Sequence, residues 1–115
     1  MSLARAAADG PAREAQFRLL ATGPGTLSAQ GPLTFASARH ACQLGAEALA
    51  HASGSRLEID CRGITLADSA GLAVLLEWLG MAKRAGRSLR YTQLPEGFLS
   101  LARISAADPL LERGV

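Results

Sequence analysis

The sequence predicts an α/β domain with a four-stranded mixed β-sheet and helices packed on one face of that sheet. Four segments alternate apolar and polar residues, as strands do when one side faces a core and the other faces water. Two long segments between them carry apolar residues at helical spacing. A strand covered by helices on both faces would be a continuous apolar run, and none of the four segments is one.

The composition limits the class of protein. A chain of 115 residues, 49% hydrophobic and 19% charged, is ordinary for one folded domain with its own core. The net charge is only +2, and no cluster of Lys and Arg is interleaved with aromatic residues, so we expect no nucleic-acid partner. The longest nearly uncharged apolar stretch, residues 64–76, is broken by polar residues, so we expect no direct membrane insertion.

The ends of the chain and its cysteines suggest where it resides. Residues 1–13 are rich in Ala and Arg and predict a flexible tail, with one domain over residues 14–111. The first eight residues lack the apolar core of a signal peptide, so we expect a cytoplasmic location. Cys42 and Cys61 stand alone in apolar patterns, which favours buried, reduced thiols.

The first alternating segments predict a β-hairpin. Residues 14–20 and 26–30 alternate, and the Thr-Gly-Pro-Gly sequence of residues 22–25 is typical of a turn between them. Gly31 and Pro32 are expected to break the second strand.

A helix with a face of small residues is expected next. We predict that it runs from Phe35 to about His51 with Thr34 as its cap. Small side chains would allow close packing against the sheet, and the residues on this face are Ala38, Ala41, Cys42, Gly45, Ala48, Leu49 and Ala52.

Two further strands are predicted over residues 56–62 and 88–92. Leu57, Ile59 and Cys61 would face inward from the first, and Leu89 and Tyr91 from the second.

The turn between residues 65 and 72 is the main candidate for function. Asp68 or Ser69 can cap the helix that follows, because each carries an oxygen that accepts from free N–H groups of its first turn. Gly71 costs about 1 kcal/mol relative to alanine inside a helix, so its presence predicts that something approaches the backbone closely. Such helix starts are common sites for anions or partners in α/β proteins.

The helix after this turn, from Ser69 to about Ala85, carries two apolar stripes. We assign one stripe to the core, formed by Leu72, Leu75, Leu76 and Leu79. The second stripe needs a neighbour, either another helix of this domain or another protein, and consists of Val74, Trp78, Met81 and Ala85. A short helix over residues 98–104 and a terminal turn complete the domain.

Enzymatic chemistry is not indicated. The chain has neither a phosphate-binding GxxxxGK[ST] loop nor a GxSxG elbow. Asp60 and Asp68 could pair as acid and base, but capping and turn roles explain them more simply. No second histidine or carboxylate pair stands at metal-binding spacing from His40. We therefore expect no enzyme activity, no cofactor and no metal.

The order of motifs resembles the STAS domain family, the module shared by sulfate transporters and anti-sigma-factor antagonists. The matching segments are residues 57–64, 67–72 and 82–86, in that order, and the resemblance extends over about residues 14–111. It implies the fold predicted above.

Within the family, the antagonists are phosphorylated on the second residue after the Asp of this turn. That position is Ala70, which has no hydroxyl, and this leaves Ser69 as a candidate phosphorylation site. The order Asp, hydroxyl residue, small residue, Gly, Leu better resembles the MlaB-type branch, as do residues 71–78 and 94–110.

The resemblance implies a non-enzymatic subunit of a phospholipid-transport ABC transporter. Such a subunit would bind the cytoplasmic ATPase and lie at the inner membrane through that partner. The alternatives are an anti-sigma-factor antagonist in a partner-switching pathway and a STAS-like module with a nucleotide or lipid ligand, and self-association is left open. We expect the partner to bind at Asp68, Ser69, Ala70 and Gly71, with Val74, Trp78 and Met81 as apolar contacts if they are exposed. Trp78 could equally pack under another helix of the domain.

Overall fold

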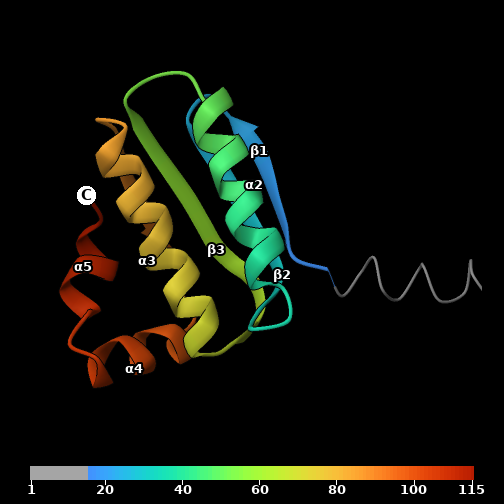
Figure 1. Cartoon of the computed structure of the whole chain (residues 1–115), viewed down its shortest axis with the longest axis vertical. Coiled ribbons are helices and arrows are strands. Elements are labelled where there is room, and N and C mark those ends of the chain that lie inside the picture. Colours follow the sequence, from blue (N-terminus) through green and yellow to red (C-terminus); the bar gives the residue numbers. More distant parts are fainter. Residues whose placement is uncertain (1–15) are drawn as a thin grey trace, which may run out of the picture.

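The computed structural model describes residues 16–115, which form a sheet with its helices on one face (Figure 1). The strand order is β1-β2-β3-β4, with β1 and β2 antiparallel and the other two pairs parallel. The strands are β1 (Arg18–Gly23), β2 (Thr26–Leu33), β3 (Arg56–Ala67) and β4 (Ser88–Thr92). The helices are α2 (Ala38–His51), α3 (Ser69–Arg84), α4 (Glu96–Ile104) and α5 (Asp108–Arg113). The predicted fold class is confirmed, whereas the predicted tail over residues 1–13 lies outside the described residues.

Strand β3 divides its side chains between core and solvent as the alternation predicts. Leu57, Ile59 and Cys61 are buried, and Arg56 and Glu58 are exposed on the open face of the sheet. Because the open face carries polar side chains, one helical layer is enough to complete the core.

The predicted end of β2 at Gly31 and Pro32 is wrong, because the strand continues to Leu33. The register between β2 and β3 shifts between Gly31 and Pro32, and this irregularity accommodates a residue that has no N–H to donate. The same pairing extends β3 to Ala67, beyond the predicted end at Arg62. Strand β1 is also displaced from the prediction and begins at Arg18.

Helix α2 begins at Ala38, three residues later than predicted, and Ser37 takes the N-cap position in place of Thr34. The Ser37 hydroxyl donates to the Pro32 carbonyl at 2.8 Å and accepts from the Thr34 N–H at 3.0 Å. Those bonds hold residues 34–37 as a loop, so Phe35 lies outside the helix and is 83% exposed.

Helix α3 is the most buried helix of the fold. Leu72, Leu75 and Leu79 are buried as predicted, while Leu76 is only half-buried. The helix ends before Gly86, whose φ of +70° suits a glycine, and Lys83 and Arg84 occupy its last turn.

Helices α4 and α5 each contribute buried side chains to the core. Phe98 and Ala102 of α4 and Leu111 of α5 are fully buried. After α5, the Val115 N–H donates to the Leu89 carbonyl at 3.0 Å, so the last described residues run beside β4.

Candidate functional site

Asp68 joins two loops at the end of the sheet where α3 begins. It has extended backbone at the N-cap of α3, and its Oδ1 accepts from the Gly71 N–H at 2.9 Å. Its Oδ2 accepts from the Phe35 N–H at 3.0 Å, across to the loop between β2 and α2. The Gly71 bond first, and then the Phe35 bond, lower the pKa of this carboxyl below its ordinary value. Asp68 therefore braces the turn by tying the start of α3 to the loop before α2.

Gly71 has no room for a side chain. A Cβ at this position would lie 2.0 Å from the Leu33 carbonyl oxygen and 3.1 Å from the Phe98 ring. The close approach predicted from the sequence is confirmed, and the approaching group is the backbone at the end of β2. Gly71 thus lets α3 start directly against the sheet.

Ser69 and Ala70 form the outer side of the same turn. Ser69 is exposed, and its hydroxyl makes no hydrogen bond with any of residues 16–115. Ala70 is half-buried and presents a methyl group. The four turn residues therefore divide into an inner pair, Asp68 and Gly71, and an outer pair, Ser69 and Ala70.

The prediction that Val74 and Trp78 contact a partner is wrong, because both side chains are buried. Val74 is 3% and Trp78 is 1% exposed, so neither can reach a partner. Trp78 donates from Nε1 to the Ala41 carbonyl at 3.2 Å and packs 5.9 Å from the ring of Phe17. Helix α2 is therefore the neighbour that the second stripe needs. Met81 is half-buried against the same core.

Two exposed apolar side chains that the residue pattern does not single out lie beside the turn. Phe35 is 83% exposed, and its N–H is the one bound to Asp68. Leu66, two residues before Asp68, is 62% exposed. The pattern placed Phe35 inside a helix and Leu66 inside the turn, and only the late start of α2 and the extension of β3 show that both face solvent. We call Phe35, Leu66, Ser69 and Ala70 the turn surface.

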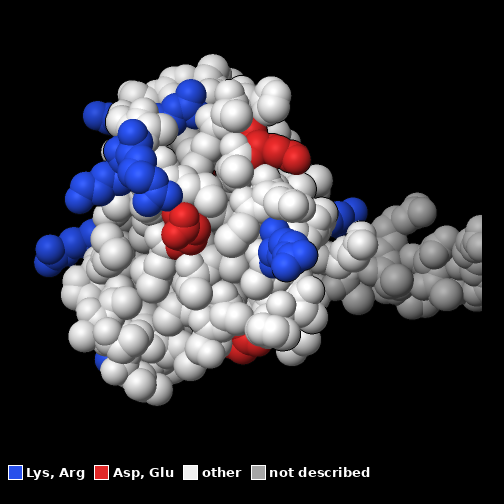
Figure 2. Space-filling view, viewed as in Figure 1, with Lys and Arg blue, Asp and Glu red and all other residues white. Residues whose placement is uncertain are grey.

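The charge distribution separates the two ends of the molecule. Figure 2 shows basic side chains gathered over the end where α3 finishes, which includes Lys83 and Arg84. The end where α3 begins carries few charged side chains in the same view. A surface with few charges and with exposed Phe35 and Leu66 suits an apolar contact with another protein.

Asp60 and Cys61, the other side chains with possible chemical roles, are paired or buried within the domain. Asp60 pairs with Arg62 at 2.8 Å, and the Arg62 backbone N–H is the main cause of its lowered pKa. Asp60 and Asp68 therefore have separate partners, as the capping and turn interpretation predicts. Burial, followed by the charge of Asp60, raises the pKa of the Cys61 thiol to about 12, so that thiol stays protonated.

Residues 16–115 contain neither a cluster of metal-binding side chains nor a helix suited to crossing a membrane. No group of three or more His, Cys, Asp or Glu side chains is placed to hold a metal ion among these residues. In the same part of the chain, no helix combines the length and the apolar character needed to cross a membrane.

Most of the chain matches the model of a known protein family. The family model described as "Mlab, STAS domain" matches residues 20–112, most of the chain. The protein belongs to the STAS domain family. The resemblance drawn from the motifs is confirmed, and the family model is of the Mlab type.

Solved structures of a STAS protein share the fold. The chain matches the Bacillus cell fate determinant SpoIIAA in its phosphorylated form with a TM-score of 0.61 and 13% identity, covering 81% of this chain and 86% of that chain. It matches the unphosphorylated form, described as an anti-sigma factor antagonist, with a TM-score of 0.63 and 13% identity, covering 81% and 83%. Among curated proteins, no sequence matches. At this identity the likeness concerns the fold alone.

Proposed function

We propose that this STAS domain is a non-enzymatic subunit of a phospholipid-transport ABC transporter. In this role it binds the cytoplasmic ATPase of the transporter, supports its assembly, and lies at the inner membrane through that partner. The observation that carries the proposal is the match of an Mlab-type family model to residues 20–112. Asp68 and Asp60 both accept hydrogen bonds from within the domain, and this structural use of the two carboxylates also favours a binding role over catalysis.

We infer that the ATPase docks on the turn surface. Phe35 and Leu66 supply exposed apolar area, and large aromatic side chains are frequent anchors of protein interfaces. Ser69 adds a hydroxyl that none of the described residues engages. Asp68 and Gly71 contribute by fixing the shape of the turn. Val74 and Trp78 support α3 from within the core.

A regulatory antagonist is the second candidate, because SpoIIAA, whose fold this chain shares, is described as an anti-sigma factor antagonist. In that pathway a kinase would phosphorylate the turn, but Ala70 offers no hydroxyl at the position that the family resemblance implies. Phosphate on Ser69 would instead add a charge of about −2 to the turn surface and oppose an apolar contact. We expect no phosphate on the chain after incubation with a serine kinase encoded near it, as judged by intact mass. Stoichiometric phosphorylation of Ser69 would favour the antagonist.

The binding test uses two exposed apolar residues as a matched pair. The ABC ATPase encoded beside this chain would be titrated with wild type, Phe35→Ser and Ile104→Ser, the last two residues being 83% and 84% exposed. Phe35→Ser should weaken binding by about tenfold or more, since it removes a central anchor. Ile104→Ser lies at the end of α4 and should bind as wild type does. Absence of binding by the wild-type chain would contradict the transporter role, and equal losses in both variants would contradict the turn surface.

A further inference from the structure

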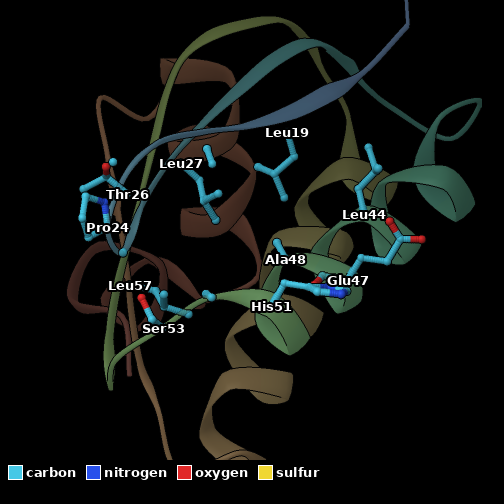
Figure 3. Close-up of a pocket in the computed structure, with 14 residues that line it drawn as sticks. Leu19, Pro24, Thr26, Leu27, Leu44, Glu47, Ala48, His51, Ser53 and Leu57 are labelled. Atoms are coloured by element: carbon cyan, nitrogen blue, oxygen red, sulfur yellow. The ribbon is translucent and has the colours of Figure 1, made fainter.

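An apolar pocket of about 390 Å³ lies between the β1–β2 hairpin and the second half of α2. In Figure 3, Leu19 and Leu27 of the hairpin face Leu44 and Ala48 of the helix across this space, with Leu57 below them. The turn surface lies at the other end of α2, ahead of its first residue. The pocket is therefore separate from the proposed ATPase site.

The pocket exists because the helix face above the hairpin is made of small residues. Ala48 and Ala52 leave space over Leu19 and Leu27, which remain only partly buried. Gly45 faces Trp78 instead of the pocket, because a Cβ there would lie 2.1 Å from Nε1 of Trp78. The half-buried leucines keep apolar area in contact with water, and an apolar ligand would remove that area from water.

The mouth of the pocket carries one formal charge, the carboxylate of Glu47. Glu47 forms no ion pair with any of residues 16–115. His51 stands one turn further along α2, and its Nδ1 donates to the Glu47 backbone carbonyl at 2.8 Å. The proton of the neutral ring is therefore on Nδ1, which leaves Nε2 as an acceptor. A carboxylate and a free ring nitrogen favour a ligand head that is cationic and donates hydrogen bonds.

We propose that this pocket binds a single-chain cationic amphiphile, with its alkyl chain on the leucines and its head at Glu47. The volume lies in the range of small-molecule sites, which combine an apolar lining with a few polar groups. The negative rim selects a cationic head over an anionic head on the same chain. No covalent step is involved.

Trp78 provides a reporter for binding. Leu19, Leu27, Ala48 and Leu57 line both the pocket and a void of about 10 Å³ that Trp78 borders. The chain has a single tryptophan, so its fluorescence reports on this region alone. The full chain would be titrated with decylammonium, whose head is cationic and donates hydrogen bonds, and, separately, with decyl sulfate, both below their micelle concentrations. We expect saturable one-to-one binding of the cationic probe, about fivefold tighter than the anionic probe.

Three variants test the assignment. Ala48→Leu fills the pocket and should abolish binding, whereas Ala46→Leu, at an exposed position of the same helix, should bind as wild type does. Glu47→Lys should reverse the preference between the two probes, and Glu112→Lys, exposed on α5, should leave it unchanged. Because Glu47 is exposed, its variant tests the proposal even if Ala48→Leu fails to fold. The proposal is overturned if the cationic probe shows no saturable binding, if folded Ala48→Leu still binds it, or if Glu47→Lys still prefers it.

Discussion

The first turn of α3 and the residues that follow it on the same helix differ in what covers them. In residues 68–71, the inner pair holds the turn against β2 while the outer pair meets solvent. In residues 74–78, the two side chains of the second stripe, which could have met either a partner or another helix, are buried, and Trp78 donates to a carbonyl of α2. The comparison teaches that apolar character alone does not identify a binding surface on a helix that packs against both a sheet and another helix.

The largest expected effect belongs to the buried half of this comparison. Trp78→Ala should lower the free energy of unfolding by about 3–5 kcal/mol, because it leaves a cavity and removes the donor to the Ala41 carbonyl. Urea denaturation followed by circular dichroism measures this loss. If the variant loses less than about 1 kcal/mol, the side chain is not a core residue in solution.

Gly71→Ala sharpens the distinction inside the turn. The added methyl meets the Leu33 carbonyl oxygen at 2.0 Å, so we expect a loss of about 1–3 kcal/mol in the free energy of unfolding. Gly80→Ala is the matched control on the same helix, because its nearest neighbour is the flexible end of Arg84 at 3.1 Å. Gly80→Ala should gain up to about 1 kcal/mol from helix propensity. Equal changes in the free energy of unfolding for the two substitutions would show that the Leu33 carbonyl of β2 does not lie against Gly71 in solution.

Asp68→Ala tests the brace and its pH dependence. Loss of the N-cap should cost about 0.5–2 kcal/mol at pH 7. The pKa of Asp68 is lower in the folded chain than its unfolded value of about 3.9, so its stabilisation is complete above that value and is lost as the pH falls through the folded pKa. The difference in unfolding free energy between wild type and Asp68→Ala should therefore shrink in acid.

Asp60→Ala is the control for the acid measurement. The pKa of Asp60 is also lowered, but its partner Arg62 is two residues away on an exposed part of the same strand. We expect a change below about 0.5 kcal/mol at pH 7. A difference for Asp68→Ala that stays constant from pH 7 to pH 3 would contradict the brace.

The local elements were predictable because their patterns are local. The alternation of apolar and polar residues predicted the observed bounds of β4 and the inward face of β3. The capping residue Asp68 and the terminating Gly86 predicted the bounds of α3 to within one residue. Gly31 and Pro32 misled the prediction because the register shift that tolerates them depends on β3, more than 30 residues away in sequence.

The candidate site was only partly predictable for the same reason. The roles of Asp68 and Gly71 follow from residue type, since one caps a helix and the other allows close approach. The burial of Trp78 depends on the small face of α2, and the exposure of Phe35 depends on where that helix begins. Both facts arise from packing between distant segments, which residue patterns along one segment do not contain.

Ser69→Arg tests the central claim, that the turn surface docks on the transporter ATPase. Ser69 is exposed, so the free energy of unfolding should change by less than about 0.5 kcal/mol. Isothermal titration calorimetry with the ABC ATPase encoded beside this chain should show that Ser69→Arg binds at least about tenfold more weakly than wild type, because the arginine places a bulky charge on an apolar contact. Ser100→Arg, at an exposed position on α4, should bind as wild type does. A folded Ser69→Arg chain that binds the ATPase with wild-type affinity would contradict the account.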